Sequence, residues 1–151
     1  MNEILIPLLI KHEGLCLTAY YCPAGKLTIG VGHNILENRS SATALSLELR
    51  EGSVITKEQA MQILKEDVAR CLFEFRQFDW FYHLSTTRQC ALVDMLFNLG
   101  LPRFLKFKKF IAAMEVGSYQ LAACEMRNSL WAKQVGERAE ELSKMIEPET
   151  F

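Results

Sequence analysis

The sequence predicts an α+β fold that is mostly helical. Three observations support this fold class. Apolar residues recur at helical spacing through most of the chain, and one early stretch alternates around a turn in the manner of a β-hairpin. The third is size, because 151 residues, half of them apolar, suffice for one domain with a substantial core.

The first element is a short helix. Ile4, Leu5, Leu8 and Leu9 fall at helical spacing, and Gly14 is a suitable stop, so the helix is predicted to end at Glu13. A proline inside a helix removes one backbone hydrogen bond. We therefore expect the helix to begin near Pro7 or to be irregular before it.

A β-hairpin is predicted next, from residue 15 to residue 31. Two alternating runs flank the turn Pro23-Ala24-Gly25, with Leu17, Ala19 and Tyr21 on one side and Leu27, Ile29 and Val31 on the other. Gly30 and Gly32 permit a bend or a close approach of the backbone.

The rest of the chain is predicted to be helical after a polar loop. Residues 34–52 are Ser-rich and are expected to form a loop or flap, with a possible helix at 42–49. Thr56 and Gln59 then form a capping-box pattern that opens a long amphipathic helix at 57–76. Further helices are predicted at 86–99, 104–116, 118–130 and 136–146.

Charge and cysteine content exclude several classes of protein. Lys plus Arg (17) nearly balance Asp plus Glu (18), so no global field attracts nucleic acid. The apolar run from Ile4 to Ile10 is too short to span a bilayer and lacks the flanks of a secretory signal. Five cysteines without a CxxC pair favour a reducing compartment over a disulfide scaffold or a zinc site. No cofactor and no metal is predicted.

Three residues around the hairpin could carry chemistry. Glu13 ends a helix, where the partial negative charge of the helix terminus favours the protonated form that a general acid needs. The hairpin brings the Thr28 hydroxyl back toward Glu13, and Cys22 precedes the turn on the same side. Taken singly, these residues are more simply a surface carboxylate, a β-forming residue and an inert thiol.

Their combined spacing resembles a known family. Glu13, eight residues, Cys22, five residues and Thr28 are followed by Ile-Gly-Val-Gly-His. This pattern is similar to that of phage-type lysozymes (endolysins or muramidases of glycoside hydrolase family twenty-four), in which Asp or Cys stands at the second position. The other matching residues are Gly14, Leu17, Ala19, Tyr20, Gly25, Ile29, Gly30, Gly32 and His33. Residues 55–68 and 89–100 look like two of the family's helices, and Trp131 with Arg138 falls in its late helical region.

The resemblance implies a lysozyme-like arrangement of a single domain over residues 1–151. A hairpin lobe would occupy about 13–56, an interlobe helix about 57–78 and a helical lobe about 79–151, with the 1–12 helix packed on the last. A cleft would separate the two lobes. The segment 34–52 and the C-terminal tail match the family poorly.

The resemblance also implies hydrolysis of the β-1,4 bond between N-acetylmuramic acid and N-acetylglucosamine in peptidoglycan. Glu13 would protonate the leaving oxygen, and Thr28 would help to hold the attacking water. Cys22 replaces the second carboxylate of two-carboxylate glycosidases. We expect Glu13 to raise the pKa of this thiol, so that Cys22 positions water or acts as a weak base.

Four further residues are assigned by the same resemblance. His33 would pair with Asp67 and tie the hairpin to the interlobe helix, and Arg138 would lie close enough to Glu13 to tune it. Phe97 would lie at the floor of the cleft and contact the substrate, although packing in the core explains a phenylalanine at this position equally well. The protein is expected to act on peptidoglycan as a monomer, without nucleic acid or stable membrane insertion. It would accumulate in the host cytoplasm until a membrane lesion such as a holin pore admits it to the periplasm and wall.

Two other functions remain open from the sequence. A thiol hydrolase with Cys22 as nucleophile and His33 as base would cut amide bonds. A non-catalytic binder of nucleic acid or of an anionic cell-wall polymer could use a basic and aromatic segment at 103–110. In that segment the helical spacing instead favours phenylalanines in the core and basic residues in solvent.

Overall fold

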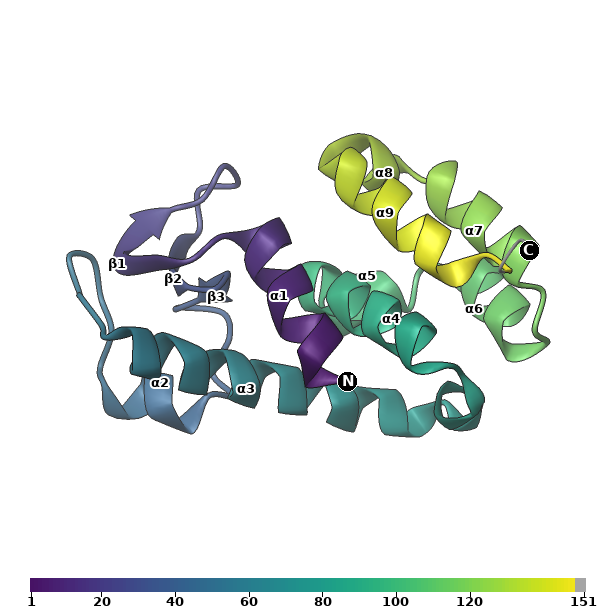
Figure 1. Cartoon of the computed structure of the whole chain (residues 1–151). Helices are drawn as coiled ribbons and strands as arrows, with labels where there is room; N and C mark the ends of the chain where they lie inside the picture. Colours follow the sequence, from purple (N-terminus) through teal and green to yellow (C-terminus); the bar gives the residue numbers. More distant parts are fainter. Residues whose placement is uncertain (149–151) are drawn as a thin grey trace. The chain divides into compact units, whose positions relative to one another are not determined.

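The computed structural model describes residues 1–148 and confirms the mostly helical α+β fold. The elements in chain order are α1 (Asn2–Glu13), β1 (Cys16–Tyr21), β2 (Leu27–Gly30), β3 (His33–Asn34), α2 (Ala42–Ser46), α3 (Lys57–Glu74), α4 (Thr86–Leu99), α5 (Leu101–Phe104), α6 (Lys108–Glu115), α7 (Tyr119–Arg127), α8 (Leu130–Val135) and α9 (Glu137–Ile146) (Figure 1). Two short 3₁₀ helices, Phe75–Gln77 and Asp79–His83, connect α3 to α4.

The chain divides into two compact units. We call Ile6–Phe73 the sheet unit, since it contains all three strands together with α2. Met1–Leu5 with Glu74–Phe151 forms the helical unit.

The sheet unit is built around a three-stranded antiparallel sheet in the order β1-β2-β3. The predicted hairpin forms its first two strands, and Tyr20 faces Thr28 across the pair. The sequence did not predict β3, in which His33 pairs with Ile29. The other edge of β1 is covered by residues 53–55, where Ala19 and Ile55 donate backbone hydrogen bonds across the pair. This sheet is small but both edges of β1 are occupied.

One apolar cluster holds the sheet against α2 and α3. Its buried members come from β2, α2, the start of α3 and the segments next to them; they are Leu27, Ile29, Ile35, Ala44, Ile55, Ala60 and Ile63. The pattern of the α3 side chains explains this position, because Ala60, Ile63 and Leu64 lie on one stripe of the helix and are buried. The predicted capping box starts α3, with Gln59 N–H donating to Thr56 Oγ1 and Thr56 N–H donating to Gln59 Oε1.

The first helix differs from its prediction at the N-terminus. Its end at Glu13 is confirmed, and Gly14 adopts φ +78° while its N–H donates to the Ile10 carbonyl. The expectation of a start near Pro7 or an irregular first part is wrong, because α1 is regular from Asn2 with Pro7 inside it. The proline costs one hydrogen bond, and the preceding turn still forms through Leu5 N–H to the Met1 carbonyl.

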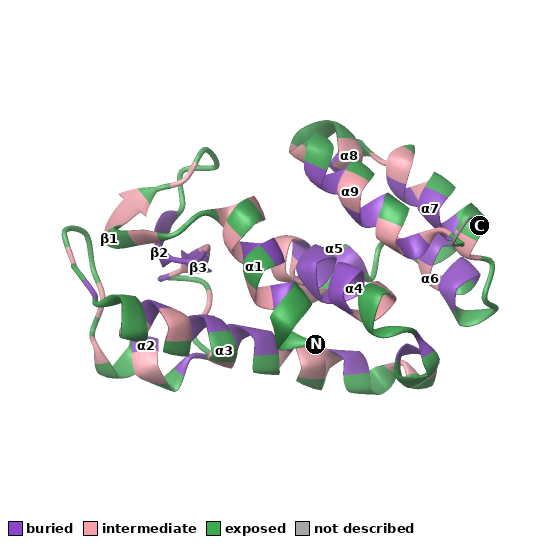
Figure 2. Cartoon of the chain, viewed as in Figure 1, coloured by how far each residue is buried: buried purple, intermediate pink, exposed green. Residues whose placement is uncertain are grey.

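The helical unit is organised around α4. Eight of its residues are buried, so nearly its whole circumference packs against neighbours (Figure 2). Arg88 at the start of α4 donates to the carbonyls of Ile146 and Glu147, which fixes the C-terminal end of α9 beside it. Rings from four segments make a second cluster, in which Phe75 stacks on Phe81 with centroids 4.4 Å apart.

The late helices are shorter and more numerous than predicted. Residues 104–116 are divided between the end of α5 and α6, and α8 was not predicted as a separate helix. Pro102 lies in the first turn of α5, where its missing N–H costs nothing, so the chain turns helical again at once. No helix within residues 1–148 is both long and apolar enough to cross a membrane.

Candidate active site

Glu13 lies at the C-terminal end of α1 and meets the turn between β2 and β3. A β-carbon built on Gly32 would approach the Glu13 Cδ and Oε1 atoms to 2.8 Å. Gly32 also has φ +61°, a conformation that residues with a β-carbon rarely adopt. The predicted close backbone approach at Gly32 is therefore confirmed, and its partner is the Glu13 carboxyl group.

Cys22 and Thr28 lie together at the turn of the hairpin. The Cys22 N–H donates to the Lys26 carbonyl at 2.9 Å, and the Thr28 hydroxyl donates to the same carbonyl at 2.9 Å. Thr28 is buried, whereas Cys22 is half-buried. The Lys26 carbonyl thus accepts from the backbone of Cys22 and from the side chain of Thr28, which holds the two residues at the same turn.

The turn also stabilises the ionised form of the thiol. Burial raises the pKa of Cys22, but hydrogen bonds from the backbone N–H groups of Lys26 and Ala24 and from the Thr28 hydroxyl outweigh it, so the pKa is lowered overall. Since the hydroxyl has one hydrogen, it serves either the Lys26 carbonyl or the thiolate. The expectation of a raised pKa is wrong, because the donors of the turn contact the sulfur and the Glu13 charge is not among the causes.

His33 and Asp67 form a buried pair that ties β3 to α3. The His33 Nδ1 atom lies 2.8 Å from Asp67 Oδ2, and both side chains are only 1% exposed. The second carboxylate oxygen accepts from the Asn38 amide at 2.8 Å. The donors that contact the Cys22 sulfur come from its own turn, and among residues 1–148 no hydrogen bond joins Cys22 to His33.

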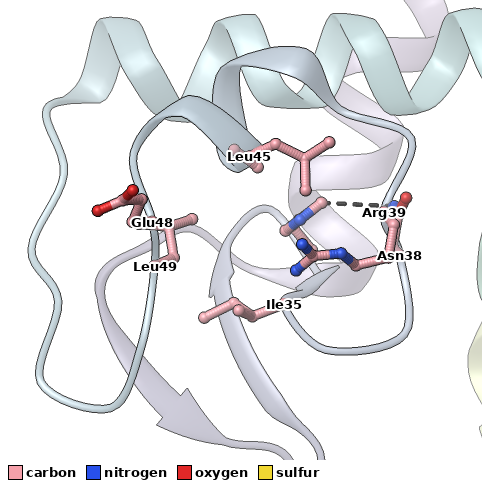
Figure 3. Close-up of a pocket in the computed structure, with 8 residues that line it drawn as sticks. Ile35, Asn38, Arg39, Leu45, Glu48 and Leu49 are labelled. Atoms are coloured by element: carbon pink, nitrogen blue, oxygen red, sulfur yellow. Dashed lines mark hydrogen bonds between the residues drawn. The ribbon is translucent and has the colours of Figure 1, made fainter.

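His33 also lines a surface pocket of about 370 Å³ in the sheet unit (Figure 3). The Arg39 guanidinium extends into it between Ile35 and Leu45, and the Glu48 carboxylate points away (Figure 3). None of Glu13, Cys22 and Thr28 lines this pocket, so it is separate from the candidate reaction groups. Within residues 1–148 no cluster of His, Cys, Asp and Glu side chains is arranged to hold a metal ion.

Arg138 and Phe97 belong to the helical unit. Arg138 is buried, and its Nε donates to Asp94 Oδ1 at 2.8 Å while Nη2 donates to the Asp94 carbonyl at 3.3 Å. Sequence reasoning missed Asp94, although a lone acid within the apolar run Cys-Ala-Leu-Val-Asp-Met-Leu-Phe was a usable signal. Phe97 lies on α4 and is half-buried.

Two of the three phenylalanine rings in the basic and aromatic segment at 103–110 are buried. Phe104 and Phe110 are buried in the aromatic cluster of the helical unit. The four basic residues Arg103, Lys106, Lys108 and Lys109 are exposed. This matches the helical-spacing interpretation for Phe104 and Phe110, and the half-buried Phe107 packs edge-on against Trp131 with ring centroids 6.3 Å apart.

Comparison with known proteins agrees with the residue pattern. The family model described as phage lysozyme matches residues 10–147. The endolysin of Acyrthosiphon pisum secondary endosymbiont phage 1 is 31% identical over 138 residues, which cover 91% of this chain and 85% of that protein. The probable T4-type lysozyme 2 of Dictyostelium discoideum is 25% identical over 168 residues, or 100% and 98% of the two chains.

A third relative is much longer than this chain. The pre-baseplate central spike protein Gp5 of Enterobacteria phage T4 is 29% identical over 161 residues, and the match spans 96% of this chain but 28% of the spike protein. The family match covers most of the chain, including the Glu13–Cys22–Thr28 pattern, and it confirms the predicted resemblance to phage-type lysozymes. The chain belongs to the phage lysozyme family.

Proposed function

We propose that this protein hydrolyses the β-1,4 bond between N-acetylmuramic acid and N-acetylglucosamine in bacterial peptidoglycan. The observation that carries the proposal is the packing of the Gly32 backbone on the Glu13 carboxyl, which fixes that group beside the same sheet that holds Cys22 and Thr28. The endolysin and lysozyme names of its relatives support a wall-degrading activity.

In this mechanism Glu13 is the general acid. Its proton passes to the glycosidic oxygen as the bond from that oxygen to the anomeric carbon breaks. The Glu13 side chain is half-buried at the C-terminal end of α1. The Gly32 backbone limits the directions in which the carboxyl can turn.

Cys22 and Thr28 would handle the attacking water. The thiolate accepts one proton from a water molecule while the water oxygen bonds to the anomeric carbon, and Thr28 holds the water through its hydroxyl. A lowered pKa increases the fraction of Cys22 that is ionised and able to accept this proton. Cys22 then releases this proton to solvent, and solvent supplies a proton to Glu13, so both groups return to their starting forms. A thiolate that acts as base on water predicts inversion at the anomeric carbon.

The biological role that fits this activity is lysis of a bacterial host. The protein would act as a monomer, would accumulate in the host cytoplasm and would reach the periplasm and wall through a membrane lesion such as a holin pore. The endolysin among its relatives supports this role.

Mass spectrometry of digested peptidoglycan tests the function. Wild type should release muropeptides with new reducing ends at N-acetylmuramic acid, and Glu13→Gln should fold normally while losing at least ~100-fold in rate. Glu3→Gln is a matched control, because Glu3 lies exposed on the same helix. New amino groups in place of reducing ends would indicate an amidase or peptidase, and an active Glu13→Gln variant would refute the acid assignment.

A further inference from the structure

We infer that Tyr20 is a further substrate-contacting residue of this site, with its phenol hydroxyl donating a hydrogen bond to a neutral oxygen of the bound saccharide. This inference rests on the proposed function and deepens it. It assigns a position that the spacing of Glu13, Cys22 and Thr28 does not include.

Strand register places Tyr20 on the same face of the hairpin as Cys22 and Thr28. Tyr20 lies directly opposite Thr28, and Tyr21 lies opposite Leu27. Residues directly opposite in an antiparallel pair share a face, and faces alternate along each strand. The Cys22 N–H continues the ladder to Lys26, so Cys22 shares the face of Tyr20 and Thr28, whereas Tyr21 points the other way.

The electrostatic surroundings of Tyr20 include both Glu13 and Cys22. Burial raises the pKa of Tyr20, and the negative charges of Glu13, Cys16 and Cys22 raise it further. A charge influences a neighbour in this way only over a short distance. Both Glu13 and Cys22 therefore belong to the electrostatic surroundings of the phenol, and its raised pKa keeps the hydroxyl protonated as a donor near neutral pH.

The Tyr20 hydroxyl is available to a ligand. No side chain or carbonyl within residues 1–148 accepts a hydrogen bond from it, whereas the Tyr21 hydroxyl donates to Glu51 at 3.1 Å. Tyr20 is half-buried, so part of its side chain is accessible to a ligand. A phenol in this setting can cover the apolar face of a sugar ring and donate to one of its oxygens.

The charges around Tyr20 define the ligand atom. A carboxylate or phosphate oxygen would be repelled by the Cys22 thiolate on the same face of the hairpin. A hydroxyl, ring or acetamide oxygen would not. The site therefore favours the neutral saccharide backbone of peptidoglycan over the acidic groups of its stem peptides.

Kinetics of Tyr20→Phe against Tyr21→Phe test the inference. Each variant loses one phenol oxygen from adjacent positions of β1. On soluble glycan strands, Tyr20→Phe should lower kcat/KM about tenfold, the change that loss of one hydrogen bond produces, with an unchanged melting temperature. Tyr21→Phe should keep the wild-type kcat/KM. Equal kcat/KM for both variants, or a loss in Tyr20→Phe that only follows a lower melting temperature, would overturn the proposal.

A binding measurement separates this inference from the proposed function. Calorimetry compares Glu13→Gln with Glu13→Gln/Tyr20→Phe for affinity to the same glycan strands, where no hydrolysis intervenes. A several-fold weaker affinity in the double variant supports a contact with substrate. Equal affinities would refute the role of Tyr20 even if Glu13→Gln is inactive. A hydrolytically active Glu13→Gln would refute the general acid, and the role of Tyr20 would then be decided by the kcat/KM of Tyr20→Phe against Tyr21→Phe.

Discussion

Gly32 packs against Glu13 so closely that a β-carbon at position 32 would come within 2.8 Å of the Glu13 Cδ and Oε1 atoms. The two residues are 19 positions apart in the chain, and the turn after β2 brings them together. Two features require glycine at position 32. The backbone has φ +61°, which glycine adopts readily, and the Glu13 carboxyl occupies the space of a β-carbon.

Gly32→Ala should therefore displace the Glu13 carboxyl. We expect the free energy of unfolding to fall by about 1–3 kcal/mol, from left-handed strain plus the clash, and lytic activity to fall at least ~10-fold. Gly52→Ala is the matched control, because Gly52 has φ +83° in the same unit and a β-carbon added there would meet nothing within 4 Å. The control should lose stability through strain alone and keep its activity per folded molecule. Equal activities for the two variants would contradict the proposed contact.

The Thr28 hydroxyl should control ionisation of the Cys22 thiol. Since that hydroxyl helps to lower the pKa, Thr28→Val should raise the pKa of Cys22 and slow its alkylation at neutral pH. The rate of iodoacetamide labelling against pH measures this in a Cys16→Ser/Cys124→Ser background, which removes the other two accessible thiols. Thr18→Val, an exposed threonine of β1, should leave the midpoint unchanged. A midpoint that does not move in Thr28→Val would remove the hydroxyl from this role.

Asp67 should be more important for stability than an ordinary acidic residue. Its carboxylate binds His33 and Asn38 in a site that is almost completely buried. Removing the charge from one member of a buried pair leaves the other poorly satisfied, so Asp67→Asn should lower the free energy of unfolding by about 3 kcal/mol. Asp79→Asn, at an exposed position, should change it by less than about 0.5 kcal/mol. Chemical denaturation of both variants checks this, and similar losses would show that the pair contributes little.

Local signals in the sequence predicted those parts of the fold that depend on neighbouring residues. Thr56 and Gln59 formed the expected capping box, and Gly14 ended α1 where expected. The two-residue strand β3 had too few residues to show a pattern, and its pairing with β2 depends on contacts distant in sequence. The prediction that α1 starts near Pro7 was wrong because it considered only the local effect of a proline. Burial of Leu5, Leu8 and Leu9 outweighs the cost of that proline.

In the candidate site, too, some features were predictable from the sequence and others were not. Glu13, Cys22 and Thr28 were predicted from their spacing, since that spacing matches a family. The direction of the Cys22 pKa shift was not, because it depends on where the N–H groups of the turn point. Neither the composition nor the spacing of residues in the sequence shows where these N–H groups point.

Glu66 provides a pH-dependent attachment of α2 to α3. Its carboxylate accepts hydrogen bonds from the Ser41 hydroxyl, from the N–H and hydroxyl of Thr43, and from the Gln62 amide. Burial raises the pKa of Glu66, but these bonds outweigh it and bring the pKa down from 4.5 to about 2. Because the pKa is lower in the folded state, the stabilisation is fully present above pH 4.5 and is lost as the pH falls toward 2.

Glu66→Gln should lower the free energy of unfolding by about 1–2 kcal/mol at pH 7, after allowance for solvent screening of a half-buried group. The difference from wild type should shrink between pH 4.5 and pH 2, since the wild-type carboxylate is then protonated as well. Urea unfolding at several pH values measures both effects. Glu58→Gln, an exposed glutamate on the same helix, should follow wild type throughout. A difference for Glu66→Gln that stayed constant from pH 7 to pH 2 would mean that side-chain shape, and not the charge, holds α2 in place.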